Sequence, residues 1–102
     1  MLKLDNFVKV KVEQLENKNQ FVIFYKDNTT GRDIIAFQSY KTLIAIYSNI
    51  TLYVNWRYWD YSKTTLKHLK MFVDRYTCFD YENKQHFLKL ITQHPRVVAF
   101  EE

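Results

Sequence analysis

Residues 53–70 read YVNWRYWDYSKTTLKHLK. Within them the apolar residues recur first at every second residue and then about every 3.6 residues. Alternation as far as Trp59 is typical of a strand, whereas the spacing that follows is typical of an amphipathic helix. The change falls at residues 60–65, where Ser62 can accept hydrogen bonds from the amides of the first helical turn. The stretch therefore predicts a strand that leads directly into a helix.

The first helix is expected to run from about Lys63 to Tyr76, with one apolar stripe along it. The stripe consists of Leu66, Leu69, Phe72, Val73 and Tyr76. A second helical stretch is expected to begin at Asp80 or Tyr81 and must end before Pro95, because proline interrupts the hydrogen bonds of a helix. Its expected apolar contacts are Phe87, Leu88 and Ile91.

Runs of strand length precede these helices. QFVIFY at residues 20–25 is rich in β-branched and aromatic side chains, which favour strands. DNTTG at 27–31 has the chemistry of a hairpin turn, and RDIIAFQSY follows as the return strand. TLIAIYS at 42–48 and ITLYVNWRYW at 50–59 predict a second hairpin. Because these connections are too short to cross over a sheet, the strands are expected to be antiparallel.

Both ends of the chain fit two readings. In residues 5–16 the valines alternate as they do in a strand, but the same region also fits a helix behind an Asp5 cap. The helical spacing joins Leu4, Val8, Val12 and Leu15. Residues 96–102, RVVAFEE, form either an added edge strand or an extended segment packed on the core.

Strands followed by helices predict an α+β fold, here a small mostly antiparallel sheet with two helices packed on one face. A chain of 102 residues has room for one domain, so residues 1–102 are expected to form a single α+β domain. With 47% hydrophobic residues, the chain can bury a core without the help of a disulfide or a metal.

Composition also bounds the cellular environment. One cysteine, Cys78, cannot form an intramolecular disulfide, which favours a reducing compartment. No stretch approaches the roughly 20 apolar residues of a membrane span, and the N-terminus lacks the apolar run of a signal peptide. We therefore expect a cytoplasmic protein without a membrane partner. The net charge of +4 permits an anionic partner and argues against mimicry of DNA by carboxylates.

Residues that usually carry catalysis are sparse. The histidines at 68, 86 and 94 have no ligand-like spacing with Cys78 or with paired carboxylates, so neither a metal site nor a nucleophilic site is expected. Gly31 stands alone, which excludes a phosphate-binding glycine loop. His68 is expected in solvent on the polar side of the first helix, and Cys78 as a small buried hydrophobe. We expect no enzymatic activity and no cofactor.

The candidate binding surface is the aromatic and basic part of residues 53–70. If the first half is a strand, one face of it carries Tyr53, Asn55, Arg57, Trp59 and Tyr61. The polar face of the following helix carries Lys63, Lys67 and Lys70. Such residues can stack bases and neutralise phosphates, and the same aromatic and arginine side chains dominate protein interfaces. A third reading is purely structural, with the aromatics in the core and the lysines in solvent.

Two segments resemble a family of small uncharacterised proteins encoded by phages and mobile elements of low-GC Gram-positive bacteria. They are FQSYKTLIAIY at residues 37–47 and YWDYSKTTLKHLKMFV at 58–73. The similarity covers about residues 20–76 and is most specific from Trp59 to His68. A composition rich in Lys, Asn, Ile, Tyr and Phe agrees with the AT-rich coding sequence of such a source. The family has no assigned activity, so its motif residues bring no assigned role.

Small phage accessory proteins without catalytic groups often occupy a surface of a host enzyme or defence complex. The resemblance therefore implies a phage-encoded inhibitor of a host nucleic-acid-processing protein, of the anti-CRISPR or another counter-defence type. Its partner would be a host protein or ribonucleoprotein complex in the bacterial cytoplasm. The alternative is a small nucleic-acid-binding regulator that uses the aromatic and basic surface.

Overall fold

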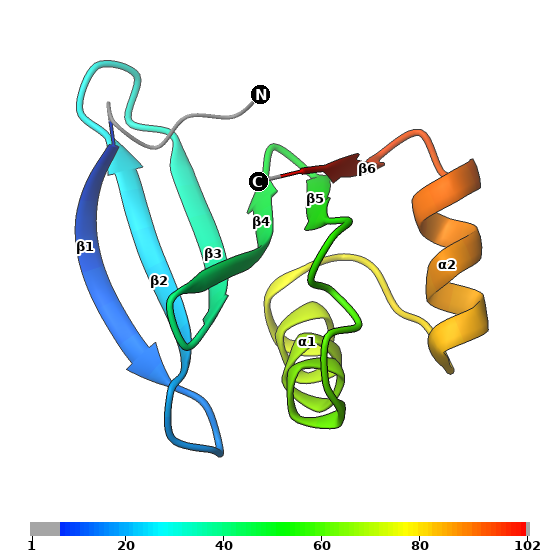
Figure 1. Ribbon diagram of the computed structural model, residues 1–102. Coiled ribbons are helices and arrows are strands. Elements are labelled where there is room, and N and C mark those ends of the chain that lie inside the picture. The colour runs from blue at the N-terminus through cyan, green and yellow to red at the C-terminus, as the bar shows by residue number, and fades with distance from the viewer. Residues whose placement is uncertain (1–6, 102) are drawn as a thin grey trace.

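The computed structural model describes residues 7–101, which form one sheet and two helices (Figure 1). The strands lie side by side in chain order: β1 (Phe7–Gln14), β2 (Gln20–Asp27), β3 (Asp33–Ser39), β4 (Thr42–Ser48), β5 (Thr51–Asn55) and β6 (Val97–Phe100). Between β5 and β6 in the sequence come α1 (Lys63–Tyr76) and α2 (Lys84–Gln93). The predicted α+β class is confirmed.

Pairing in the sheet is mostly antiparallel, as predicted. Each neighbouring pair from β1 to β5 is antiparallel, whereas β6 runs parallel to β5. Parallel neighbours need a long crossover connection, and residues 56–96 with both helices supply it. Of the two alternatives predicted for the C-terminal segment, the added edge strand is therefore the one that the structure shows.

β1 settles the choice for the N-terminal region in favour of a strand. It pairs with β2 along its length, and a β-bulge lies between Lys9 and Lys11. The helical alternative is wrong for residues 7–14. Their helix-like spacing is only a local signal, and the pairing of these β-branched valines with β2 outweighs it. Leu4 and Asp5, which supported the helical alternative, lie outside the described residues.

The hairpin turns follow from their residue types. Asp27 accepts hydrogen bonds from the backbone N–H of Thr29 at 2.8 Å and from the hydroxyl of Thr30 at 2.9 Å, and these bonds lower the pKa of the Asp27 carboxyl. Gly31 follows with φ of 74°, which glycine adopts without steric cost. The predicted turn at 27–31 is therefore confirmed.

α1 begins and ends where the sequence predicts. The Ser62 hydroxyl accepts a hydrogen bond from the backbone N–H of Thr65 at 3.1 Å, which confirms Ser62 as the cap. At the other end, the backbone N–H of Thr77 donates to the carbonyl of Val73 at 3.3 Å. The helix thus has a side-chain cap at its start and a backbone bond to its last turn at its end.

α2 begins at Lys84, later than the predicted start at Asp80 or Tyr81. Asn83 is the cap, and its side-chain oxygen accepts a hydrogen bond from the backbone N–H of His86 at 2.9 Å. Tyr81 instead anchors the connection between the helices, where its buried ring lies 4.3 Å from the ring of Phe87. The helix ends before Pro95, as predicted.

Both helices pack on the same face of the sheet, as predicted, with α2 beside β6 (Figure 1). Their apolar side chains share one core with that face of the sheet. The buried members are Leu15, Val22, Phe37, Ile44, Ala45, Leu52, Val54, Trp59, Leu69, Phe72, Val73, Tyr81, Phe87, Ile91 and Val97. A smaller buried cluster consists of Ile34, Ala36 and Ile46, with Phe7, Tyr25, Leu43 and Tyr53 partly buried against it.

Candidate binding site at the strand-to-helix corner

β5 ends at Asn55, earlier than predicted, because the buried side chain of Asn55 holds a turn. Its Nδ2 donates to the carbonyl of Leu43 at 2.8 Å, and its Oδ1 accepts from the backbone N–H of Arg57 at 3.1 Å. Residues 56–61 are therefore turns and not a strand. The predicted strand face that would carry the aromatics of residues 53–61 together does not exist.

Trp59 was predicted as a binding residue, but it belongs to the core. Its side chain is 3% exposed, and its ring packs 5.4 Å from the ring of Phe87 on α2. Lys84 lies 5.8 Å from the Trp59 ring centroid and binds the Asp60 carboxylate at 3.2 Å. Trp59 and Asp60 thus join the strand-to-helix corner, residues 56–62 between β5 and α1, to α2. Tyr53 is half-buried against the smaller cluster of Ile34, Ala36 and Ile46.

The three lysines predicted to form one basic helix face have different surroundings. Lys63 is exposed and has no ion pair among the described residues. Lys67 binds the Glu16 carboxylate at 2.9 Å, which lowers the pKa of Glu16. Lys67 therefore connects α1 to the turn between β1 and β2, and its charge is locally balanced.

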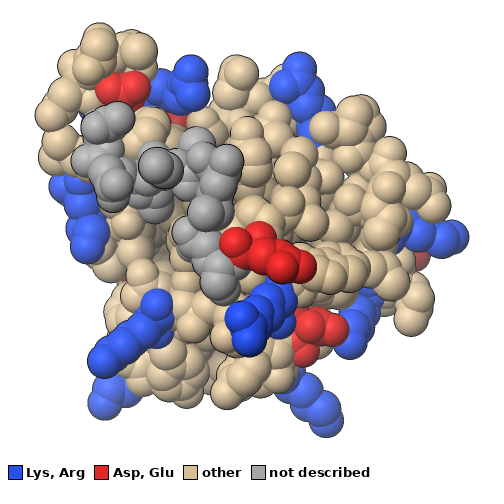
Figure 2. Space-filling model, turned by 45° about the horizontal axis from the view of Figure 1, so that its top comes forward, with Lys and Arg blue, Asp and Glu red and all other residues tan. Residues whose placement is uncertain are grey.

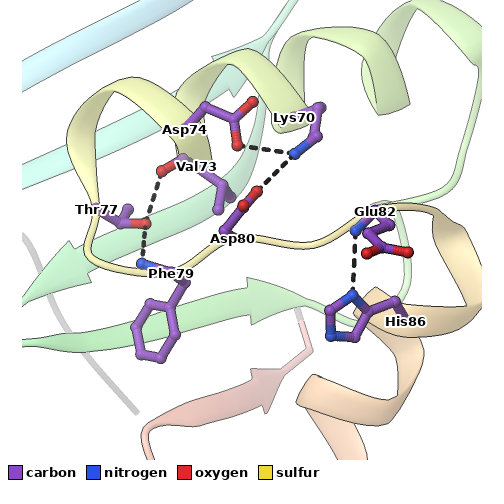
Figure 3. Close-up of polar contacts among 8 residues, drawn as sticks. All are labelled: Lys70, Val73, Asp74, Thr77, Phe79, Asp80, Glu82 and His86. Carbon is purple, nitrogen blue, oxygen red and sulfur yellow. Dashed lines mark hydrogen bonds and ion pairs between the residues drawn. The ribbon is translucent and has the colours of Figure 1, made fainter.

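Lys70 bridges two carboxylates at the end of α1 (Figure 3). It binds Asp74 at 2.8 Å and Asp80 at 2.9 Å, which raises the pKa of Lys70 and lowers that of Asp80. The same ammonium lies 4.7 Å from the ring centroid of Tyr81, whose pKa is raised by burial. Lys70 therefore fixes the connection between the helices. Figure 2 agrees that basic side chains are spread over the face it shows, with acidic ones among them.

His68 is buried, so the prediction that it faces solvent is wrong. Its Nδ1 lies 2.7 Å from the carbonyl oxygen of Thr64, and its Nε2 lies 3.1 Å from the backbone nitrogen of Asn17. A carbonyl only accepts and a backbone N–H only donates, so Nδ1 carries the proton and Nε2 accepts. His68 thus ties α1 to the β1–β2 turn, and neither ring nitrogen is available for a ligand.

Cys78 is exposed, which contradicts the prediction of a buried thiol. Thr77 sets this geometry at the end of α1 (Figure 3). Its hydroxyl donates to the carbonyl of Val73 at 2.8 Å and accepts from the backbone N–H of Phe79 at 3.0 Å. Phe79 packs against the main core, and Cys78 between Thr77 and Phe79 is left in solvent.

The exposed thiol gives a simple prediction. Cys78 in the folded protein is expected to react with a chromogenic disulfide reagent within about tenfold of the rate of the unfolded chain, because no opening step precedes the reaction. Stopped-flow absorbance with and without denaturant measures both rates, and Cys78→Ser gives the blank. A native reaction limited by global unfolding would show that the thiol is buried after all.

An open cavity of about 700 Å³ lies where the β3–β4 turn meets the start of α1. We call it the corner cavity, and it is lined by Ser39, Tyr40, Lys41, Thr42, Leu43, Ile44, Asn55, Tyr58, Tyr61, Ser62, Thr64 and Thr65. This lining contains hydroxyls, tyrosine rings, one amide and one lysine. Both segments that carry the sequence resemblance, 37–47 and 58–73, contribute to it.

Hydroxyl groups join the strand side of the corner cavity to the helix side. The Ser39 and Thr65 hydroxyls are 3.3 Å apart, and the Thr65 and Ser62 hydroxyls are 3.0 Å apart. Ser39 and Thr65 are buried, so these bonds hold the end of β3 against the first turn of α1. Part of the similarity carried by residues 37–47 and 58–73 therefore has a structural role.

The rim of the corner cavity is aromatic and basic. Tyr61 is 72% exposed, and its ring meets the ring of Tyr58 edge to face with centroids 6.2 Å apart. The exposed guanidinium of Arg57 lies 5.6 Å from the Tyr58 ring centroid. Lys41 is exposed on the opposite side, in the β3–β4 turn. Aromatic surface and positive charge thus meet at one opening.

Tyr40 completes the rim from the β3–β4 turn. Its φ of 55° is uncommon for a bulky residue, and its ring is exposed. Two hydrogen bonds hold this conformation: the Tyr40 N–H donates to the carbonyl of Asn19 at 2.7 Å, and the Tyr40 carbonyl accepts from the side chain of Gln38 at 2.7 Å. The strained turn therefore presents Tyr40 at a fixed position.

The structure brings together some of the predicted binding residues and separates others. Arg57, Tyr61 and Lys63 lie at or beside the corner cavity. Those elsewhere are Tyr53, Trp59, Lys67 and Lys70. Sequence reasoning missed Tyr40, Lys41 and Tyr58 as rim residues. The tight turn at Tyr40 was the available signal, but only the packing of this turn against α1 makes it part of a site.

Residues 7–101 hold no group of three or more His, Cys, Asp or Glu side chains placed to bind a metal ion. Neither α1 nor α2 has the length and apolar content needed to cross a membrane.

Comparison with known proteins identifies a family without an assigned activity. No curated protein and no solved structure matches the chain. A family model described as a family of unknown function (DUF8033) matches residues 10–89. The match includes every residue that lines the corner cavity. The chain therefore belongs to this family of unknown function, DUF8033.

Proposed function

We propose that this chain acts by binding another macromolecule, as a phage-encoded inhibitor of a host nucleic-acid-processing protein. The inhibitor is of the anti-CRISPR or another counter-defence type, and its partner is a host protein or ribonucleoprotein complex in the bacterial cytoplasm. The source and the inhibitory role rest on the resemblance carried by residues 37–47 and 58–73. The corner cavity and its rim are the proposed contact surface.

The observation that carries the binding mode is the exposed group of Tyr40, Tyr61 and Arg57 around one recess. Tyrosine and arginine are enriched among the residues that contribute most to protein interfaces, particularly where a pocket excludes water around them. The cavity of about 700 Å³ is large enough to accept side chains of a partner. A recess with a tyrosine and arginine rim therefore supports protein binding.

The lining of the corner cavity supports binding over catalysis. Serine and threonine hydroxyls become nucleophiles only when a neighbouring base removes their proton. The described residues that line the cavity include no histidine, cysteine or carboxylate to act as that base, and their one lysine, Lys41, is exposed to solvent. Two of the hydroxyls, on Ser39 and Thr65, are occupied by hydrogen bonds that hold the fold.

Tyr61→Ala tests the contact surface. This variant is expected to weaken partner binding at least tenfold, because it removes a large exposed ring at the rim. Its free energy of unfolding should change by less than about 0.5 kcal/mol, as for most surface substitutions. Affinity capture from a Gram-positive host lysate with mass spectrometry supplies the partner, and titration calorimetry with the purified partner measures the affinity.

Trp56→Ala is the matched control for Tyr61→Ala. Trp56 is also an exposed aromatic, but it lines a separate recess with Ile91 and Phe100. The proposal expects wild-type affinity for this control and a further loss when Arg57→Ala is added to Tyr61→Ala. Wild-type affinity in the Tyr61 and Arg57 variants, with a loss in the control, would move the contact surface away from the corner cavity.

A nucleic-acid-binding regulator is the second candidate, and one observation favours it. Lys41, Arg57 and Lys63 at the corner have no ion pair among residues 7–101, whereas Lys67 and Lys70 do. Unpaired cations beside exposed tyrosines can neutralise phosphates while the rings stack on bases. Fluorescence titration with single-stranded DNA and RNA at several salt concentrations separates the two candidates. Phosphate-driven affinity falls steeply with salt, and absence of binding at low salt eliminates the regulator.

A further inference from the structure

β1 is an open edge of the sheet. It pairs with β2 on one side, and no strand of the described residues pairs with its other side (Figure 1). All residues of β1 except Phe7 and Glu13 are exposed. A long exposed edge strand presents unpaired N–H and C=O groups, to which a strand of another chain can add.

Apolar side chains are concentrated on this edge. Val8 is 45% exposed, Val10 is 65% exposed and Val12 is 49% exposed. The other exposed large hydrophobic residues of the described chain are dispersed over turns and β6, namely Tyr40, Ile50, Trp56, Tyr61 and Val98. β-branched side chains on a paired strand are favourable because they pack against their cross-strand neighbours. The valines would therefore gain contacts if β1 acquired a second neighbour.

The hydrogen bonds between β1 and β2 show which backbone groups of β1 face outward. The backbone N–H of Leu15 donates to the carbonyl of Gln20 at 2.7 Å, so Leu15 is directed toward β2. Residues alternate in an antiparallel ladder, and Glu13 and Lys11 are directed the same way. The N–H and C=O groups of Val12 and Gln14 therefore point away from β2, to the open edge.

The charges of β1 distinguish among the registers in which two copies can pair. An antiparallel pair centred on Val10 places Lys9 opposite Lys11, and one centred on Lys11 places two lysines opposite each other. A pair centred on Val12 places Lys11 opposite Glu13 twice. In one chain these two side chains already lie on the same face, with Lys11 Nζ 3.5 Å from Glu13 Oε1. Opposite charges stabilise cross-strand pairs and like charges destabilise them.

We propose that two copies of the chain associate through β1, antiparallel and about a two-fold axis at Val12. Residues 10–14 of each copy form the pair, with backbone bonds from Val12 and Gln14 and reciprocal Lys11–Glu13 contacts. The partner is thus a second copy of this chain, chosen by charge complementarity along the strand.

Features that usually protect an edge limit this contact and do not prevent it. The bulge between Lys9 and Lys11 lies at one end of the paired segment, and Leu15 turns into the core at the other. Both restrict pairing to a short stretch.

The two-fold axis is perpendicular to the sheet, so the two sheets become continuous and the helices of both copies lie on one side. The corner cavity contains no β1 residue and stays open in the dimer, which makes this inference independent of the proposed function.

Sedimentation velocity of the whole chain over a wide concentration range tests the dimer. The wild type is expected to show a reversible monomer–dimer equilibrium. Val12→Pro removes an outward N–H without removing a bond to β2, and it is expected to raise the dissociation constant at least tenfold. Circular dichroism of this variant shows whether the fold is retained.

A charge exchange tests the register even if Val12→Pro perturbs β1. Lys11→Glu and Glu13→Lys each place like charges opposite each other and are expected to weaken the dimer at least tenfold. The double variant restores opposite charges and should return the dissociation constant to within about threefold of the wild type. Lys18→Glu, in the exposed β1–β2 turn, changes the net charge by the same amount as Lys11→Glu and should have no such effect. A monomer at every concentration, or a double variant no tighter than the single ones, overturns the proposal.

Discussion

Trp59→Ala is expected to lower the free energy of unfolding by about 3–5 kcal/mol, the range for truncation of a large buried aromatic residue. The indole is almost fully buried and fills the space between the corner and α2, where it packs on Phe87. Alanine would leave a cavity that the surrounding strands and α2 cannot close without moving. The substitution also removes the cation–π contact between Lys84 and the Trp59 ring.

Equilibrium denaturation of Trp59→Ala, followed by far-ultraviolet circular dichroism, measures this loss. Trp56→Ala is the control, because Trp56 is 40% exposed and its removal should cost less than about 1 kcal/mol. Equal stability of Trp59→Ala and the wild type would show that the indole contributes little to the core. Trp59 would then return to the set of candidate binding residues.

Local sequence signals were sufficient for most of the elements. The change of period after Trp59 and the Ser62 cap predicted α1 correctly, because both signals lie within one helical turn of the boundary. The hairpins were predictable for the same reason, since turn chemistry is local. β1 was ambiguous from sequence because its valines fit both periods, and only pairing with β2 decides between them.

The errors arose where a distant contact determines the structure. β5 ends at Asn55 because its amide binds the carbonyl of Leu43 on β4, which no local pattern reveals. α2 begins late because Tyr81 is held in the core against Phe87 and Asn83 then caps the helix. Cys78 lies among apolar neighbours in the sequence, but the bonds of Thr77 direct Phe79 inward and leave Cys78 in solvent.

The candidate site was predictable only in part. Arg57 and Tyr61 were singled out by composition, because exposed aromatics beside cations are a general feature of binding surfaces. The corner cavity itself needs the β3–β4 turn, with Tyr40, to lie against the first turn of α1. That arrangement depends on the bond between Ser39 and Thr65, which are 26 residues apart in the chain. Residue type could therefore suggest the chemistry of the site but not its members.

His68→Ala is expected to lower the free energy of unfolding by about 2–4 kcal/mol. It leaves the part-buried backbone N–H of Asn17 without its acceptor and removes the side-chain bond to the carbonyl of Thr64, and a polar group left unpaired in this way costs about 1–3 kcal/mol. The lost ring also leaves a cavity, which adds to the cost. His68→Leu fills much of this volume but restores neither bond, so its expected loss is about 1–3 kcal/mol.

Lys67→Ala is the neighbouring control for the His68 variants. Its ammonium also contacts the β1–β2 turn, through Glu16, but both side chains are about half exposed, so this ion pair is worth at most about 1 kcal/mol. Thermal and urea unfolding should therefore place the variants in the order Lys67→Ala, His68→Leu, His68→Ala, from least to most destabilised. If Lys67→Ala costs as much as His68→Ala, the solvent-exposed ion pair and not the buried histidine holds the β1–β2 turn against α1. Amide hydrogen exchange at Asn17 distinguishes these cases directly, because only loss of the His68 ring removes the acceptor of that N–H.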